Sequence, residues 1–229
     1  MAVLLCIESS TDVCSVAIAR GGEVVALCES GGTRDHAALL APFVARALAE
    51  AGLAPQQLDA VAVSQGPGSY TGLRIGVSTA KGLCFGLGKP LVAVGSLHAL
   101  AALAVQPASL HAAELLCPMT DARRMEVYTA LFDAHGAPLA EATAQVVGEG
   151  SFDDALRHRR VAFFGSGAAK CRGVIASPNA VFLDVPVSAS GMAALAEQRC
   201  REQRFEDVAY FTPFYLKDFV AIASTKRMF

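Results

Sequence analysis

Apolar residues alternate along the chain between short runs typical of buried strands and longer stretches with helical spacing. The first half predicts strands at 3–7, 14–20 and 23–28, and the turn Gly21-Gly22 suits a hairpin between the last two. Strands at 59–64 and 90–94 then alternate with helices at 35–51, 69–86 and 96–105. Pro42 lies inside the first helical pattern, so we expect a kink or a restart there.

The second half begins with a similar order of elements. Strands are predicted at 115–119, 126–132, 138–147, 161–164 and 181–185, with helices near 151–159 and 188–203. The recurrence favours two related α/β lobes with mixed sheets, one spanning 1–105 and the other 106–229. The aromatic-rich tail, from about 210 to 229, should pack back onto the first lobe.

Composition and charge limit the classes of function that this chain could have. A formal net charge of -2 argues against independent nucleic-acid binding. The seven cysteines show no C-x-x-C spacing, which is typical of reduced thiols in a reducing compartment. The apolar runs are too short to span a bilayer, so we expect a soluble cytoplasmic protein without a membrane partner.

The run 66–76, GPGSYTGLRIG, follows an apolar strand and opens a helix. Such a turn can hold a phosphate on its backbone N–H groups, or it can let two backbones approach closely. The run matches neither standard phosphate-binding pattern. Gly72, Gly76, Ala80 and Cys84 recur every four residues and form a small-residue stripe, which could face the preceding helix or a helix of another chain.

Residues 8–12, ESSTD, end the first strand, and Asp121 ends the matching strand of the second half. A carboxylate followed by hydroxyl groups can hold a hydrated Mg²⁺ and a phosphate, or it can close a hydrogen-bonded turn. Asp121 could face Glu8 across a cleft or clamp its own loop with Arg123. The candidate nucleotide loop comprises Glu8, Ser10, Thr11, Gly66 and Asp121.

Four stretches carry a resemblance to a known family: 4–11 with 14–17, 66–76, 121–128 and 212–217. In these the chain resembles the TsaB (YeaZ) family, which is needed to make threonylcarbamoyladenosine in tRNA. The resemblance implies the acetate/sugar kinase–Hsp70–actin (ASKHA) fold, with two lobes of RNase H-like topology. It also implies a non-catalytic scaffold that activates threonylcarbamoyl transfer to the adenosine beside the anticodon, in tRNAs reading codons that begin with adenine.

The resemblance implies partners as well: the catalytic paralogue TsaD, the ATPase TsaE, and a second copy of the chain when TsaD is absent. It implies tRNA contact only through the assembled complex, and no cofactor except ATP or ADP at a composite interface. The implied interface lies on helices 35–51 and 69–86, so Gly76→Leu should break association in a folded monomer. Its residues are His36, Leu39, Leu40, Phe43, Tyr70, Gly72, Ile75, Gly76, Thr79 and Ala80.

Two positions separate the chain from the catalytic paralogue, which carries a metal-binding H-x-x-x-H after its fifth strand. Here the two ligand positions are Ser96 and Leu100. Many relatives have Asp where this chain has Glu8, and the longer side chain weakens a nucleotide role for this lobe. A free-standing ASKHA-type ATPase or small-molecule kinase remains the alternative.

Overall fold

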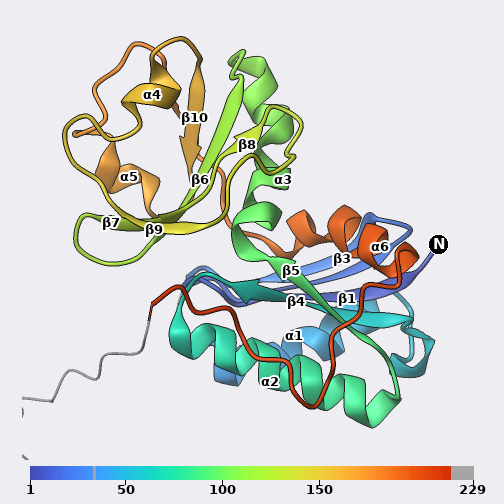
Figure 1. The fold of residues 1–229 in the computed structure, drawn as a ribbon. Helices are drawn as coiled ribbons and strands as arrows, with labels where there is room; N and C mark the ends of the chain where they lie inside the picture. The colour runs from blue at the N-terminus through green and yellow to red at the C-terminus, as the bar shows by residue number, and fades with distance from the viewer. Residues whose placement is uncertain (33–34, 218–229) are drawn as a thin grey trace, which may run out of the picture.

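The structure, a computed structural model, describes residues 1–32 and 35–217 and divides into two lobes (Figure 1). The first lobe contains a five-stranded sheet in the order β3-β2-β1-β4-β5. Its strands are β1 (Val3–Glu8), β2 (Ser15–Arg20), β3 (Glu23–Glu29), β4 (Ala60–Gly66) and β5 (Leu91–Gly95).

The second lobe contains a six-stranded sheet in the order β11-β10-β6-β7-β9, with β8 paired to β6. Its strands are β6 (Leu115–Asp121), β7 (Glu126–Thr129), β8 (Phe132–Asp133), β9 (Thr143–Val146), β10 (Val161–Phe164) and β11 (Ala180–Phe182). In each sheet a central strand, β1 or β6, has an antiparallel neighbour on one side and a parallel neighbour on the other. The predicted fold class, with two related α/β lobes, is therefore confirmed.

Both faces of the first sheet are buried, which explains why its inner strands read as continuous apolar runs. The larger side chains, including Leu5, Ile7, Val61 and Val63, face helices α1 (His36–Glu50) and α2 (Tyr70–Leu87). The opposite face carries several small side chains beside Leu4, Val92 and Val94, and it packs against η2 (Ala189–Met192) and α6 (Ala193–Arg201). Its small residues are Cys6, Ala17, Ala19, Ala60 and Ala62.

Two helices run through prolines where the sequence predicted a break or an earlier end. Helix α1 continues past Pro42, which is exposed. Proline has no backbone N–H, so one carbonyl group in the preceding turn loses its helical hydrogen bond. Because this side of the helix is exposed, water can bind that carbonyl group. Helix α3 (Ser96–Leu110) includes Pro107 and extends beyond the predicted end at 105. The remaining helices are short: η1 (Pro55–Gln57), α4 (Asp153–Leu156) and α5 (Ala168–Cys171).

The lobe boundary differs from the prediction because two helices cross it. Helix α3 follows β5 of the first sheet, yet Leu100 and Ala104 pack with Phe164 in the core of the second lobe. Helix α6 follows the second sheet in sequence, yet Ala193 and Ala196 at its start and middle pack on the first sheet. Residues 189–201 thus belong with the first lobe, although they were assigned to 106–229.

The chain then runs along the first lobe from 205 to 217, coloured red in Figure 1. Glu206 pairs with Leu91 of β5, and Lys81 of α2 donates to the carbonyl oxygens of Ala209 and Phe211, at 3.0 Å each. The part of the predicted tail at 218–229 lies outside the described residues. Within the described residues, no helix has the length and apolar character needed to cross a bilayer.

We predict opposite effects from two glycine-to-alanine substitutions on α2. A Cβ atom at Gly72 would overlap the carbonyl oxygen of Ser9, whereas one at Gly82 meets nothing within 4 Å. Gly72→Ala should lower the free energy of unfolding by about 1–3 kcal/mol through overpacking. Gly82→Ala should raise it by up to about 1 kcal/mol through helix propensity. Urea denaturation measures both, and an equal gain in both variants would contradict the packing described.

Candidate functional site

The turn after β1 is bound directly to the glycine run that opens α2. The backbone N–H of Ser69 donates to the carbonyl oxygen of Ser10 at 2.7 Å. The hydroxyl of Ser69 caps α2 by accepting from the N–H of Gly72 at 3.3 Å. Two N–H groups at this helix start, those of Ser69 and Gly72, therefore donate to oxygens of the chain itself.

Three glycines make this contact possible. A Cβ atom at Gly68 would overlap the backbone of Ser10, and one at Gly72 or Gly76 would overlap Ser9. The hydroxyl of Ser9 is buried against Gly76, and no hydrogen-bond partner for it is found among the described residues. Of the two uses considered for the glycine run, the geometry matches close approach of two backbones within one chain.

Glu8 lies inside the protein rather than at the edge of a cleft. Its side chain is 1% exposed and accepts a 2.6 Å hydrogen bond from the N–H of Ser10. Burial raises the pKa of the Glu8 carboxyl group, and hydrogen bonds from Ser10, Ser64 and Ser9 oppose that rise. Ser10 and Thr11 are buried as well. These groups complete a hydrogen-bonded turn.

The other two residues of the candidate nucleotide loop have partners of their own. Asp121 forms an ion pair with Lys170 of α5 and accepts a 3.0 Å hydrogen bond from the N–H of Arg123. The N–H of Gly66 donates to the hydroxyl of Ser96 at 3.1 Å, and a Cβ atom at Gly66 would meet the carbonyl oxygen of Phe214 at 2.5 Å. The structure thus gives both residues roles within the chain.

The predicted small-residue stripe does not face outward. Ala80 and Cys84 are buried in the core beneath α1 and α2, and Gly72 and Gly76 are buried against Ser9. His36, Leu40 and Phe43 are also buried within the chain. Gly76→Leu would therefore disturb the monomer itself, which corrects the expectation of a folded variant. The predicted interface residues that are partly exposed are Leu39, Tyr70, Ile75 and Thr79.

A different small-residue stripe lies on the outer side of α2. Ser78, Gly82 and Gly86 are exposed at the same four-residue spacing, and a Cβ atom at either glycine would meet nothing within 4 Å. Neighbouring α1 exposes Ala41 and Ala45. Each helical glycine is unfavourable by about 0.8–1 kcal/mol relative to Ala, and no contact within the described chain offsets that loss here. The sequence prediction missed this stripe, although its spacing was visible.

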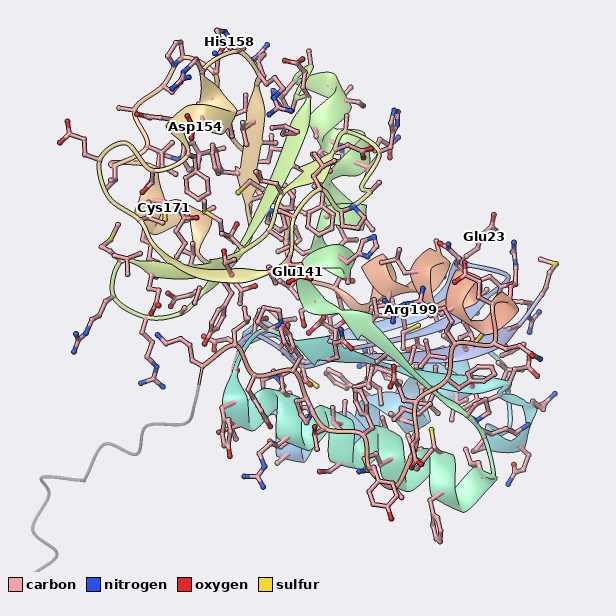
Figure 2. All side chains as sticks on the ribbon, in the orientation of Figure 1. Glu23, Glu141, Asp154, His158, Cys171 and Arg199 are labelled. Carbon is pink, nitrogen blue, oxygen red and sulfur yellow. The ribbon has the colours of Figure 1, made fainter. Side chains whose placement is uncertain are left out.

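A cavity of about 610 Å³ separates the lobes beside the start of α3. Figure 2 shows Glu141 on the second lobe and Arg199 on the first, at opposite sides of this space, and both line the cavity. His98 lines it too and packs against Phe132, with 5.4 Å between ring centroids. Burial and the charge of Arg199 lower the pKa of His98.

Ser96 and Leu100 occupy the two positions that match the metal ligands of the catalytic paralogue. Neither side chain provides a metal ligand at this cavity. The Ser96 hydroxyl accepts from Gly66, and Leu100 is 2% exposed in the core of the second lobe. In residues 1–32 and 35–217, no group of three or more His, Cys, Asp or Glu side chains is arranged to hold a metal ion.

Comparison with known families and proteins agrees with this architecture. Residues 29–224 match the family model described as TsaD, tRNA N6-adenosine threonylcarbamoyltransferase. A curated relative from Haemophilus influenzae, the tRNA threonylcarbamoyladenosine biosynthesis protein TsaB, is 40% identical over 55% of this chain and 51% of its own length. The protein of the same name from Bacillus subtilis is 39% identical over 56% of this chain and 54% of its own. The chain thus aligns with about half the length of these relatives.

Solved structures extend the similarity over nearly the whole chain. A Pseudomonas aeruginosa protein described as similar to the peptidase YeaZ has a TM-score of 0.83 and 28% identity, covering 95% of this chain and 100% of that one. Component A of (R)-2-hydroxyglutaryl-CoA dehydratase from Acidaminococcus fermentans shares the fold alone, with a TM-score of 0.52 and 11% identity over 88% of this chain and 100% of its own. The chain belongs to the TsaD family of the matching model and, within it, to the TsaB (YeaZ) group.

Proposed function

We propose that the chain is a non-catalytic scaffold in tRNA threonylcarbamoyladenosine biosynthesis. In this proposal it activates threonylcarbamoyl transfer to the adenosine beside the anticodon, in tRNAs that read codons beginning with adenine. It binds the catalytic paralogue TsaD together with the ATPase TsaE, forms a homodimer when TsaD is absent, and works in the cytoplasm. The names of the curated relatives and of the family model support the assignment to this pathway.

The observation that carries the proposal is the closed start of α2. A protein that bound a nucleotide there would need free N–H groups and space for a phosphate. Instead the Ser9-Ser10 backbone lies against Gly68 and Gly72, and the Ser69 hydroxyl accepts from the N–H of Gly72, the third residue of the helix. Glu8 is buried in the same turn, away from any position where it could hold a hydrated metal ion. Any ATP or ADP would then bind only at an interface shared with a partner.

The outer face of α1 and α2 supports a partner surface. We define the docking face as Leu39, Tyr70, Ile75, Ser78, Thr79, Gly82, Phe85 and Gly86. Its centre, at Ser78, Gly82 and Gly86, is flat enough for a helix of another chain to approach closely. Phe85 is 87% exposed beside it, and a large exposed aromatic side chain is a typical anchor of protein interfaces.

We predict that Gly82→Leu abolishes association without unfolding the monomer. Leucine has higher helix propensity than glycine, and its side chain would project from the exposed face. The affinity for TsaD should fall at least about ten-fold, which corresponds to about 1.4 kcal/mol. Co-purification and calorimetry with TsaD measure the loss, while thermal unfolding should show an unchanged or higher midpoint.

The matched control is Ala169→Leu, an exposed small residue on α5 of the second lobe. It should leave the affinity for TsaD unchanged. Full affinity in Gly82→Leu, or an equal loss in both variants, would contradict docking through the face defined above. A wild-type chain that never associates with TsaD would contradict the scaffold proposal itself.

We predict that the isolated chain shows no submillimolar binding of Mg·ATP by calorimetry. The closed helix start and the buried Glu8 provide the physical reason. Glu8→Ala serves as the matched variant. Binding by the wild-type chain that disappears in Glu8→Ala would favour the alternative, a free-standing ASKHA-type ATPase or small-molecule kinase.

A further inference from the structure

Three of the chain's four tyrosines lie where the end of the described tail crosses between the lobes. Tyr215 packs on Tyr70 at the start of α2, with 4.9 Å between ring centroids. The Arg74 guanidinium lies over the Tyr70 ring, 5.3 Å from its centroid, and donates to the Tyr70 hydroxyl at 3.0 Å. This places a guanidinium plane and the partly exposed ring of Tyr215 next to each other on the surface.

The second lobe contributes cations at the same place. Lys217, two residues beyond Tyr215, forms an ion pair with Glu126 at the start of β7. The N–H of Glu126 donates to the carbonyl oxygen of Arg123 at 3.0 Å, so the turn between β6 and β7 adjoins the tail. Burial raises the pKa of Tyr128 on β7, and the charges of Lys217 and Arg123 oppose that rise. Figure 1 shows the red tail ending between α2 and the strands β7 and β9.

The charge of this region is positive although the chain as a whole is slightly acidic. Glu126 is paired with Lys217, and Asp121 is paired with Lys170. Among the described residues, no carboxylate lies within ion-pair distance of Arg74, Arg123 or Arg124. Arg123 and Arg124 both have positive φ, 72° and 47°, in a turn that leaves their side chains exposed.

We propose that this region binds single-stranded RNA, and we define it as the tyrosine–arginine surface: Arg74, Arg123, Arg124, Tyr128, Tyr215 and Lys217. Aromatic rings interleaved with cations match unpaired nucleotides, whose bases stack while their phosphates pair. An acidic peptide would use the cations but would leave the aromatic rings without a matching planar group. The inference rests on the proposed function, because a tRNA loop is the RNA that such a complex would meet.

The test measures the affinity of the complex with TsaD for a fluorescent RNA hairpin, by anisotropy at several salt concentrations. The hairpin carries the anticodon loop of a tRNA that reads codons beginning with adenine. Charge reversal in Arg123→Glu/Arg124→Glu should weaken binding at least about ten-fold at low salt. The slope of log affinity against log salt should fall by about 1.4, because two phosphate contacts are lost.

The matched charge control is Arg159→Glu/Arg160→Glu, an exposed arginine pair that follows His158 at the far end of the second lobe (Figure 2). It should leave affinity and slope unchanged. Equal losses of RNA affinity in both double variants, or no loss in either, would overturn the proposal that this surface binds RNA. Both double variants should retain full assembly with TsaD, so a loss of assembly would be distinguished from a loss of RNA binding.

A second pair of variants tests stacking. Tyr215→Ala should weaken RNA binding about five-fold or more, whereas Tyr215→Phe should retain it, because phenylalanine keeps the ring. Tyr210→Ala, which removes an 83% exposed ring from the same tail, should have no effect. Competition by polyglutamate as effective as that by unlabelled hairpin would overturn the assignment to RNA. If the chain fails to assemble with TsaD, the scaffold proposal fails, and titration of the isolated chain still tests this surface.

Discussion

The rest of the structure depends on the contact between the turn after β1 and the first residues of α2. Two backbones meet there with no side chain between them, because Gly68, Gly72 and Gly76 have no Cβ atom to overlap Ser9 and Ser10. The contact sets how closely α2 lies against the first sheet. It also uses two N–H groups at the start of the helix, those of Ser69 and Gly72. Close packing of these two backbones thus stabilises the first lobe.

The two lobes are joined by exchange of elements as well as by the chain between them. Helix α3 leaves the first sheet and packs in the second core, while α6 returns from the second lobe to the first sheet. The small residues on that face of the sheet, such as Ala17 and Ala62, allow α6 to lie close. The tail then crosses the junction again and ends at the ion pair between Lys217 and Glu126. The core of each lobe therefore includes a helix that adjoins the other lobe in sequence.

Both binding surfaces proposed for this chain lie on its exterior. The docking face on α1 and α2 is flat and nearly uncharged, as suits the close approach of another helix. The tyrosine–arginine surface lies at the start of α2, where the lobes meet, and adjoins the docking face at Tyr70. A scaffold with these two surfaces would hold a catalytic partner through one and an RNA loop beside it through the other. Helix α2 contributes to both, through Gly82 and Arg74.

The sequence alone determined the elements whose signals are local. Continuous apolar runs identified β1 and β4, the pair Gly21-Gly22 placed the hairpin, and the family motifs were read from a few contiguous residues. Only the tertiary structure decided which face of α2 is buried. Small residues recur every four positions in two sets, one with Gly72 and Gly76 and the other with Ser78 and Gly82, and periodicity is equal in both. Which set faces Ser9 depends on the turn after β1, some sixty residues away, and no pattern within one helix contains that information.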